Sequence, residues 1–306
     1  MPNTNVTLLQ VAIDRISTLD PKLGQQLRSL PEASVPEYQA RAESFLRRYK
    51  LYAESLCLTF ESGIDCFIHL QHSVEEQWKT FFKTGRYAST SFEEVNRAVY
   101  SNPEIMRRHM HGLVFAQFFW QDQYKRFQFF CDNLPHYAPM VSRYLEVGGG
   151  HALYLVEAAS ELSAATAIDV IDVSPTSIEM AKGIANNPRI CYHLSHFAGF
   201  PEDQKYDFIT MGEVLEHVEE PREMLWKIQR LLAPGGRAYI TTCANAPMLD
   251  HIYLFRNAEE IRDMLVECGF AIEQETQQFK IDVPTRLGER CKVPLMYAAF
   301  VYKAAG

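Results

Sequence analysis

The first 135 residues of the chain carry a helical pattern of apolar positions. Apolar residues recur at three- and four-residue spacing over residues 6–19, and a second amphipathic stretch covers residues 36–58. Such spacing places side chains on one face of a helix. Ser73 and Ser91 are each followed three residues later by Glu, a pair typical of a helix N-terminus. We therefore expect residues 1–135 to be all-helical.

The longest predicted helix begins at Pro103, because proline suits the first position of a helix. Its apolar stripe continues for about 30 residues, and Gln117 is the one strongly polar side chain that interrupts it. A buried amide without a partner costs ~1–3 kcal/mol. Gln117 is therefore expected to bind a ligand or, alternatively, a backbone carbonyl or an ordered water. Trp120 and Tyr124 follow on the same predicted face, so all three could line one wall.

Beyond Pro135, short β-rich runs alternate with helical stretches. The predicted strands cover residues 144–147, 166–172, 190–194, 206–211, 237–242, 270–275 and 295–302, and the predicted helices cover residues 153–161, 177–185, 214–218, 222–232 and 257–268. This alternation indicates a mostly parallel, doubly wound α/β sheet that binds ligands at the carboxyl ends of its central strands. We expect a helical cap or dimerisation domain over residues 1–135 and a Rossmann-like domain over residues 136–306.

Composition is that of an ordinary globular protein, with 47% hydrophobic and 22% charged residues in a chain of 306. The net charge of −8 argues against binding to nucleic acid, which attracts basic surfaces. No uncharged apolar run approaches the ~18 residues of a membrane span. The first five residues lack the pattern of a signal peptide. We therefore expect a cytoplasmic protein that contacts no membrane.

Metal-binding spacings are not found in the sequence. The seven cysteines are scattered and include no Cys-x-x-Cys pair, which argues against both a disulfide framework and a thiolate metal cage. His193 and His196 lie three residues apart, but no carboxylate stands at ligand spacing beside them. No metal site is predicted.

A glycine-rich segment directly follows the first predicted strand and opens a helix. Residues 146–155 read Glu-Val-Gly-Gly-Gly-His-Ala-Leu-Tyr-Leu, and glycine lets a backbone turn tightly and approach a ligand. Asp172 ends the second predicted strand, 22 residues past Gly150, where a carboxylate can accept from both hydroxyls of a ribose. This spacing fits any nucleoside-binding doubly wound sheet, including those that bind nicotinamide dinucleotides.

Four motifs in order resemble those of class I S-adenosylmethionine-dependent methyltransferases. They are Glu-Val-Gly-Gly-Gly at 146–150, Ile-Asp-Val-Ser-Pro-Thr-Ser-Ile-Glu-Met-Ala at 171–181, Gly-Glu-Val-Leu-Glu-His-Val-Glu-Glu-Pro at 212–221 and Leu-Leu-Ala-Pro-Gly-Gly-Arg at 231–237. Dinucleotide oxidoreductases have no counterpart of the last two motifs. The resemblance extends over residues 141–303 and implies a seven-stranded sheet whose last hairpin inserts an antiparallel strand. It also implies S-adenosylmethionine as the cofactor.

The resemblance also implies which residues contact the cofactor. Glu146 would orient the glycine loop or the cofactor amine, and Asp172 would bind the ribose. The full set of expected cofactor-binding residues is Glu146, Gly148, Gly149, Gly150, Asp172, Val173, Ser195, His196, Phe197 and Glu213, with Trp120 of the long helix. Two positions depart from the family pattern. Ala152 replaces the third glycine, and no acid follows the third strand, so Phe197 is expected to stack on the adenine instead.

Candidates for contact with the methyl acceptor are His251, Gln117 and Tyr124. His251 follows the fifth predicted strand in a loop that lies over the cleft in this family, although a structural role is nearly as well supported. His217 is interpreted as a structural residue of a helix, with a role as a base as the open alternative, and His109 and His111 are interpreted as surface residues.

An aromatic-rich helical cap on an acidic chain favours a small-molecule acceptor. No Asn-Pro-Pro-Tyr or Asp-Pro-Pro-Tyr follows the fourth strand, which argues against methylation of adenine bases or of protein glutamine. We expect in-line methyl transfer to a small molecule in primary or secondary metabolite biosynthesis, by an enzyme that could form a homodimer through its N-terminal helices. Two alternatives stay open. One is a relative that cyclises the aminobutyrate arm and releases methylthioadenosine, and the other is a non-catalytic cofactor-binding subunit.

Overall fold

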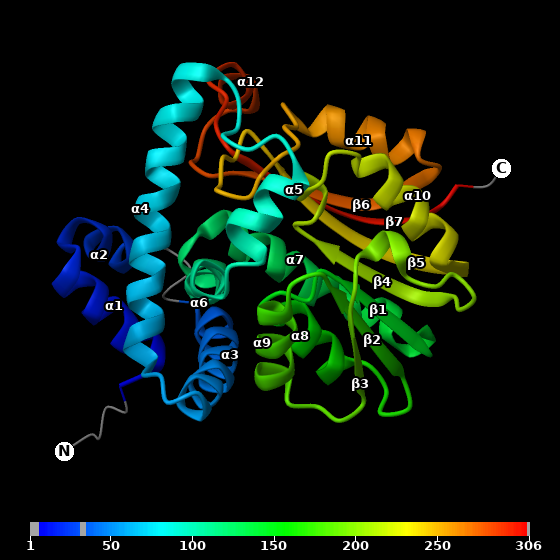
Figure 1. The fold of residues 1–306 in the computed structure, drawn as a ribbon, viewed down its shortest axis with the longest axis horizontal. Helices are drawn as coiled ribbons and strands as arrows, with labels where there is room; N and C mark the ends of the chain where they lie inside the picture. The colour runs from blue at the N-terminus through cyan, green and yellow to red at the C-terminus, as the bar shows by residue number, and fades with distance from the viewer. Residues whose placement is uncertain (1–5, 31–34, 305–306) are drawn as a thin grey trace.

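The first part of the molecule is a set of helices that stands beside a sheet (Figure 1). The computed structural model describes residues 6–30 and 35–304, so the segment used to predict the absence of a signal peptide lies outside it. The helices are α1 (Leu8–Leu19), α2 (Pro21–Arg28), α3 (Pro36–Ser55), α4 (Phe60–Thr84), α5 (Phe92–Val95), the π-helical turn η2 (Asn96–Tyr100), α6 (Pro103–Phe119) and α7 (Gln121–Tyr137).

The second part alternates strands with helices. Its elements are η3 (Ala138–Met140), β1 (Arg143–Val147), α8 (Leu153–Glu161), β2 (Ala167–Asp172), α9 (Pro175–Ala185), β3 (Ile190–Leu194), η4 (Phe197–Gly199), β4 (Tyr206–Gly212), η5 (Leu215–His217), α10 (Pro221–Leu231), β5 (Leu232–Ala244), α11 (Ala258–Glu267), β6 (Phe270–Phe279), α12 (Thr285–Arg290) and β7 (Leu295–Lys303). The strand order is β3-β2-β1-β4-β5-β7-β6, and β7 runs antiparallel to its neighbours. This order confirms the predicted Rossmann-like, seven-stranded sheet.

Alternate residues of the central strands pack against opposite faces of the sheet. Leu145 and Val147 of β1 belong to the buried cluster that includes α10 and α11, whereas Tyr144 belongs to the cluster that includes the N-terminal helices. A parallel strand that is covered on both faces carries a nearly continuous apolar run. The pattern therefore located β1 and β4 within one residue of their observed ends.

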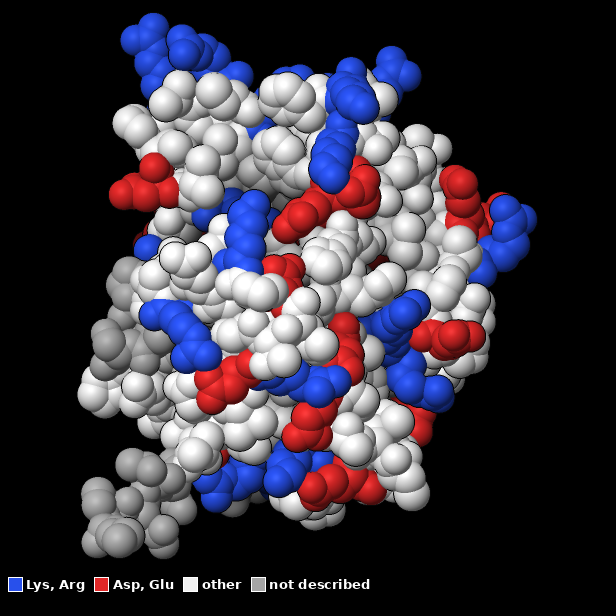
Figure 2. Space-filling model, turned by 90° about the vertical axis from the view of Figure 1, so that its left-hand side faces the viewer, with Lys and Arg blue, Asp and Glu red and all other residues white. Residues whose placement is uncertain are grey.

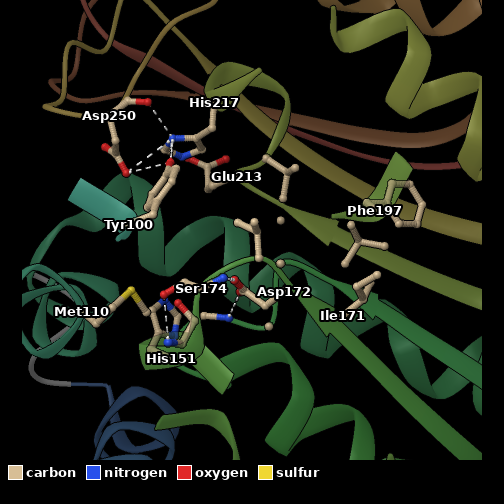
Figure 3. Close-up of a pocket in the computed structure, with 18 of the residues that line it drawn as sticks. Tyr100, Met110, His151, Ile171, Asp172, Ser174, Phe197, Glu213, His217 and Asp250 are labelled. Atoms are coloured by element: carbon tan, nitrogen blue, oxygen red, sulfur yellow. Dashed lines mark hydrogen bonds and ion pairs between the residues drawn. The ribbon is translucent and has the colours of Figure 1, made fainter. Parts of the chain in front are cut away.

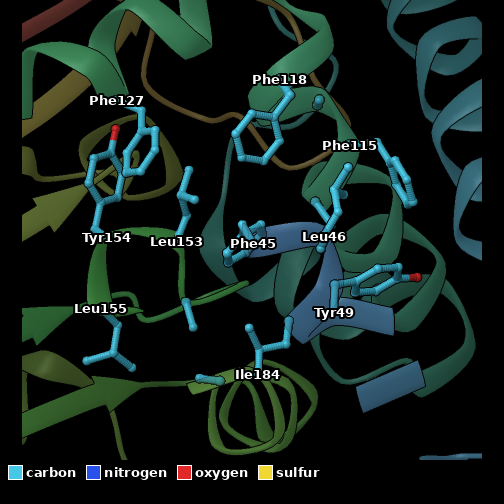
Figure 4. Close-up of a cluster of buried hydrophobic side chains, with 14 of the residues drawn as sticks. Phe45, Leu46, Tyr49, Phe115, Phe118, Phe127, Leu153, Tyr154, Leu155 and Ile184 are labelled. Atoms are coloured by element: carbon cyan, nitrogen blue, oxygen red, sulfur yellow. The ribbon is translucent and has the colours of Figure 1, made fainter. Parts of the chain in front are cut away.

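One buried aromatic cluster joins the N-terminal helices to the sheet. Figure 4 shows Phe45 and Tyr49 of α3 beside Phe115 and Phe118 of α6, with Tyr154 of α8 across from them. The rings of Tyr49 and Phe115 meet edge to face at 5.4 Å between centroids, an arrangement favoured by the aromatic quadrupole. Because this core is continuous, the position of α6 is fixed relative to β1, β2 and α8.

One predicted helix start in the helical part is wrong, and another is confirmed. Ser73 lies inside α4, where i,i+3 and i,i+4 pairs such as Lys79 with Glu76 continue the helix past it. Helix α7 continues through Pro135 to residue 137, so the predicted domain boundary falls inside a helix. Ser91 does cap α5, since its Oγ accepts from the Glu94 amide at 3.2 Å. The division into separate domains of residues 1–135 and 136–306 stays a prediction.

The predicted long helix is broken at Trp120. This residue is extended, with φ −99° and ψ 112°, so α6 ends at residue 119 and α7 begins in a new direction at residue 121. The indole Nε1 donates to Gln71 Oε1 at 2.8 Å, which holds the break against α4. Hydrophobic periodicity runs through this position without a gap, and for that reason the sequence pattern did not reveal the break.

Charged side chains of both signs are interspersed on the side of the molecule formed by α1, α2 and α4 (Figure 2). Ion pairs such as Arg15 with Asp65 and Arg28 with Asp14, both at 2.6 Å, account for part of this pattern. Among the described residues, no helix is long and apolar enough to cross a membrane. The predicted homodimer through these helices stays a prediction.

Candidate functional site

A cavity of about 380 Å³ lies at the carboxyl ends of β1, β2 and β4, beneath α6. One part is formed by the β1–α8 loop, the end of β2 and the residues after β3. The other part is formed by side chains from η2, α6, α7, η5 and the loop after β5. Figure 3 shows Tyr100, His217 and Asp250 of this part close together. The two parts differ in how they are built.

The β1–α8 loop takes a backbone path that favours glycine. Gly148 and Gly150 have φ of +77° and +45°, and Gly148 N donates to Ile171 O at 2.8 Å. Ala152 also has a positive φ, +64°, so alanine occupies a conformation that costs it roughly 1–2 kcal/mol. Ala152 therefore replaces the third glycine of the family pattern at a position whose backbone favours glycine.

Asp172 ties the end of β2 to the glycine loop. Its Oδ2 accepts from Gly150 N at 3.2 Å and its Oδ1 accepts from Ser174 N at 2.8 Å. Burial raises the pKa of this carboxyl, and these amide donors act in the opposite direction. Each carboxylate oxygen keeps a lone pair that can face the cavity, which suits the two hydroxyls of a ribose. The residues present therefore fit the ribose of S-adenosylmethionine.

Glu146 lies beneath the loop with its carboxyl buried. It accepts from Tyr144 Oη at 2.7 Å, and burial raises its pKa to about 8. A carboxyl with that pKa is mostly protonated at neutral pH, so it can donate a hydrogen bond into the cavity that it lines. Both predicted roles, orienting the loop and contacting the cofactor amine, stay predictions.

The residues expected near adenine lie at one end of the same cavity. Val173, Ser195, His196 and Phe197 all line it, as does Gly149. Lys227 lies 5.4 Å from the centre of the Phe197 ring and donates to the carbonyls of residues 198 and 200, which fixes the turn that carries the ring. Stacking of Phe197 on adenine stays a prediction.

In the other part of the cavity, Glu213 is paired with Arg126. The guanidinium of Arg126 on α7 is buried and contacts Glu213 Oε1, and its Nη2 donates to Gln123. Burial disfavours both charges, but the arginine outweighs it and lowers the pKa of Glu213. Glu213 faces the cavity as predicted, but Arg126 occupies one of its oxygens, a partner that the sequence did not indicate. Thr241 Oγ1 donates to the same oxygen at 3.0 Å.

Several donors converge on Asp250, in the loop after β5 (Figure 3). Its Oδ2 lies 3.3 Å from Tyr100 Oη, 3.5 Å from His217 Nδ1 and 3.7 Å from His109 Nε2. Burial raises the pKa of Asp250, but these two histidines outweigh it, so the carboxyl has a strongly lowered pKa. Its other oxygen, Oδ1, is buried without a partner among the described residues. The cluster therefore carries a buried negative charge.

His217, His109 and His251 all line the cavity. The His109 side chain is only 9% exposed, so its interpretation as a surface residue is wrong. The role of His217 stays a prediction. The ring of His251 meets that of His217 edge to face at 4.8 Å, and its Nδ1 lies 2.6 Å from Ala246 O. Burial lowers the pKa of His251 to about 4, so it is neutral at physiological pH. His251 remains a candidate for acceptor contact that also holds its own loop.

Of the three residues predicted to form one wall, only Gln117 lines the cavity. Its side chain is 4% exposed and its Oε1 has no partner among the described residues. The break at Trp120 turns the chain, so that Trp120 contacts α4 and Tyr124 packs between Tyr38 and the Phe118 ring in the helical core. The predicted places of Trp120 and Tyr124 in the site are therefore wrong.

Some polar contacts could not be anticipated from spacing along the chain. His193 Nε2 lies 2.7 Å from Asp169 of the neighbouring strand β2, although no carboxylate stands near it in the sequence. His217, Asp250 and His251 likewise bring polar atoms within 4.8 Å of one another. These groups bond to one another and to backbone carbonyls, and the absence of a metal stays a prediction.

Known proteins resemble the chain over its second half. The sequence pattern of the methyltransferase domain family matches residues 120–275, just over half of the chain. The mitochondrial ubiquinone biosynthesis O-methyltransferase of Schizosaccharomyces pombe is 34% identical over 103 residues, 32% of this chain and 36% of that protein. The ubiquinone biosynthesis O-methyltransferase of Xanthomonas oryzae is 30% identical over 110 residues, 35% of this chain and 45% of that protein. The chain thus spans less than half the length of these curated relatives.

A solved structure shares the fold over a larger part of the chain. The phosphoethanolamine N-methyltransferase 2 of Haemonchus contortus, in complex with phosphomonomethylethanolamine and S-adenosylhomocysteine, covers 71% of this chain and 61% of its own at a TM-score of 0.51. At 14% identity this likeness concerns the fold alone. Together with the family match over residues 120–275 and the observed strand order, it shows that the chain belongs to the class I S-adenosylmethionine-dependent methyltransferases.

Proposed function

We propose that this protein transfers the methyl group of S-adenosylmethionine to a hydroxyl group of a small, uncharged molecule, in primary or secondary metabolite biosynthesis. The observation that carries the proposal is the single cavity that joins the glycine loop and Asp172 to the polar cluster around Asp250. The O-methyltransferase relatives support oxygen as the acceptor atom.

The charges in the cavity favour an uncharged acceptor. Arg126 is the only lysine or arginine among the described residues that line it, and it is paired with Glu213. Recognition of a phosphate or carboxylate calls for an unpaired cation or a free set of amide donors. Asp250 adds a buried negative charge beside the acceptor part, which disfavours an anion further.

Residues on the two sides of the cavity would have different roles in the reaction. S-adenosylmethionine, when bound, supplies an electrophilic methyl group on a sulfonium. Asp172 would hold its ribose, while Met106, Met110 and Leu113 of α6 would exclude water from the reacting atoms. Gln117, whose Oε1 has no partner among the described residues, would accept a hydrogen bond from the acceptor and orient it. Such alignment is worth up to ~7–11 kcal/mol relative to a bimolecular encounter.

A pair of matched acceptors tests the proposal. The full chain is incubated with S-adenosylmethionine and either catechol or 3,4-dihydroxybenzoate, which differ by one carboxylate, and methyl ethers are measured by mass spectrometry. We expect kcat/KM to be at least tenfold higher for catechol. An equal or higher value for the carboxylate would contradict an uncharged acceptor, and methylation of aniline in preference to catechol would contradict the hydroxyl group.

A further inference from the structure

His217 is placed with one ring nitrogen held by the protein. Its Nδ1 lies 3.0 Å from the Asp250 backbone carbonyl, 3.0 Å from Tyr100 Oη and 3.5 Å from Asp250 Oδ2. The backbone carbonyl can only accept, so Nδ1 carries the proton in that bond. The neutral ring then keeps its lone pair on Nε2. No described residue bonds to Nε2, and the side chain is 18% exposed where it lines the cavity.

We propose that His217 is the general base that removes the proton from the acceptor hydroxyl, with Asp250 and Tyr100 as positioning residues. This inference rests on the proposed methyl transfer to a hydroxyl group. In the step, Nε2 takes the hydroxyl proton and the acceptor oxygen forms a bond to the methyl carbon. The methyl–sulfur bond breaks with its electron pair on sulfur, which leaves S-adenosylhomocysteine, a methyl ether and a proton on His217 that passes to water.

The surroundings of His217 favour its protonation. Burial lowers the pKa of this ring, but Asp250, Glu216, the Asp250 backbone carbonyl and Glu213 together outweigh it, so that the pKa of His217 is raised. The other titratable groups that face it are Tyr100, His109, His251 and Asp172. A neighbouring carboxylate that stabilises the imidazolium is the arrangement by which an Asp–His pair accepts a proton in catalysis. Asp250 also favours protonation of His109 and His251, but burial and the neighbouring His217 outweigh it there, so the pKa values of both rings are lowered.

His217 and its two positioning residues come from three segments that lie far apart in the sequence. Tyr100 ends the π-helical turn η2, His217 ends η5, and Asp250 lies in the loop after β5. The segment before η2 is attached to the β5 side by Ser89 Oγ, which donates to Leu249 O at 3.3 Å. This attachment helps to hold Tyr100 and Asp250 at the same histidine nitrogen.

Two acceptors of different acidity test the inference. Wild type, His217→Gln and the matched control His109→Gln are assayed with catechol and with 4-nitrocatechol, at a pH where only the nitro compound is ionised. An ionised acceptor needs no base. We expect His217→Gln to lower kcat on catechol by at least 100-fold, within the usual range for a general base, and on 4-nitrocatechol by less than tenfold. The control should change both rates by the same factor.

Each other result has a definite meaning. Equal losses on the two acceptors in folded His217→Gln, as judged by melting temperature, would overturn the role as base. Turnover that is abolished by EDTA and restored by magnesium or zinc would overturn it too, because the cluster would then act by binding a metal. A wild-type enzyme that methylates neither acceptor would contradict the proposed function itself, and the inference would fail with it.

The pH dependence of turnover by the wild-type enzyme gives a second test of His217 as the base. The base must be deprotonated, so kcat on catechol should rise as pH increases through the pKa of His217 and then level off. With 4-nitrocatechol this rise should be absent once the acceptor is ionised. Asp250→Asn should move the rise to lower pH, because the ring loses the carboxylate that raises its pKa. An unmoved profile in Asp250→Asn would contradict the positioning role of Asp250.

Discussion

The two parts of the cavity are built in different ways. On the cofactor side, a stretch of fewer than 30 residues from Glu146 to Ser174 supplies backbone amides and two carboxyl groups, held by a loop with positive φ at Gly148 and Gly150. On the acceptor side, polar side chains converge from η2, α6, α7, η5 and the loop after β5. A site made of local backbone therefore leaves a motif in the sequence, whereas a site made of converging side chains does not.

Removal of Arg126, on the acceptor side, should cause the largest loss of stability. Arg126→Met leaves Glu213 without its partner in a mostly buried position, and breaking such a pair costs ~3–5 kcal/mol. Because the Glu213 side chain is 24% exposed, we expect about 3 kcal/mol of lost stability, measured by chemical denaturation. Arg126→Met with Glu213→Gln should recover most of the loss. No recovery would mean that the pair itself is not responsible.

Removal of Asp172 should weaken cofactor binding while the fold persists. Each charge-assisted bond to a ribose hydroxyl is worth ~1.5–3 kcal/mol, so Asp172→Ala should weaken S-adenosylmethionine binding by at least tenfold in calorimetry. Gly150→Val should weaken it further, because its side chain would enter the cofactor's space in a strained backbone. Asp169→Ala is the matched control, since Asp169 lies on the same strand but bonds to His193. Unchanged affinity in folded Asp172→Ala would remove Asp172 from the site.

Gln117→Leu tests the acceptor side more finely. Its Oε1 has no partner in the part of the chain that the structure describes, so the change should keep stability within about 1 kcal/mol while it lowers single-turnover product formation severalfold. Tyr124→Phe, in the helical core on the next helix, should leave turnover unchanged. A shifted melting temperature with normal turnover in Gln117→Leu would show that the amide is structural.

Ala152→Gly should have the smallest effect, on the cofactor side. Glycine adopts φ +64° without the steric cost of a Cβ atom, but it loses more backbone entropy on folding. The two terms nearly cancel, and we expect a gain of less than about 1 kcal/mol in the free energy of unfolding, with unchanged cofactor affinity. A clear loss of stability would show that the Ala152 methyl group makes an essential packing contact.

The sheet and the cofactor side were predictable because each rests on local patterns. Strand β3 and helix α8 have the predicted bounds, since apolar runs and the glycine turn delimit them directly. The acceptor side was not predictable, because Tyr100 and His217 meet across 117 residues and no periodicity encodes that contact. The error at Trp120 has the same origin. Its extended backbone depends on contact with α4, while its sequence neighbours alone favour a helix.

The nucleoside that leaves the enzyme shows most directly whether the protein transfers the methyl group. The full chain is incubated with S-adenosylmethionine that carries a deuterated methyl group, together with catechol, and all products are analysed by mass spectrometry. Methyl transfer predicts S-adenosylhomocysteine in equal amount with a deuterated methyl ether of catechol. Methylthioadenosine would instead show that the aminobutyrate arm reacts, and intact S-adenosylmethionine, bound but not consumed, would show a non-catalytic cofactor-binding protein; either result would contradict the account.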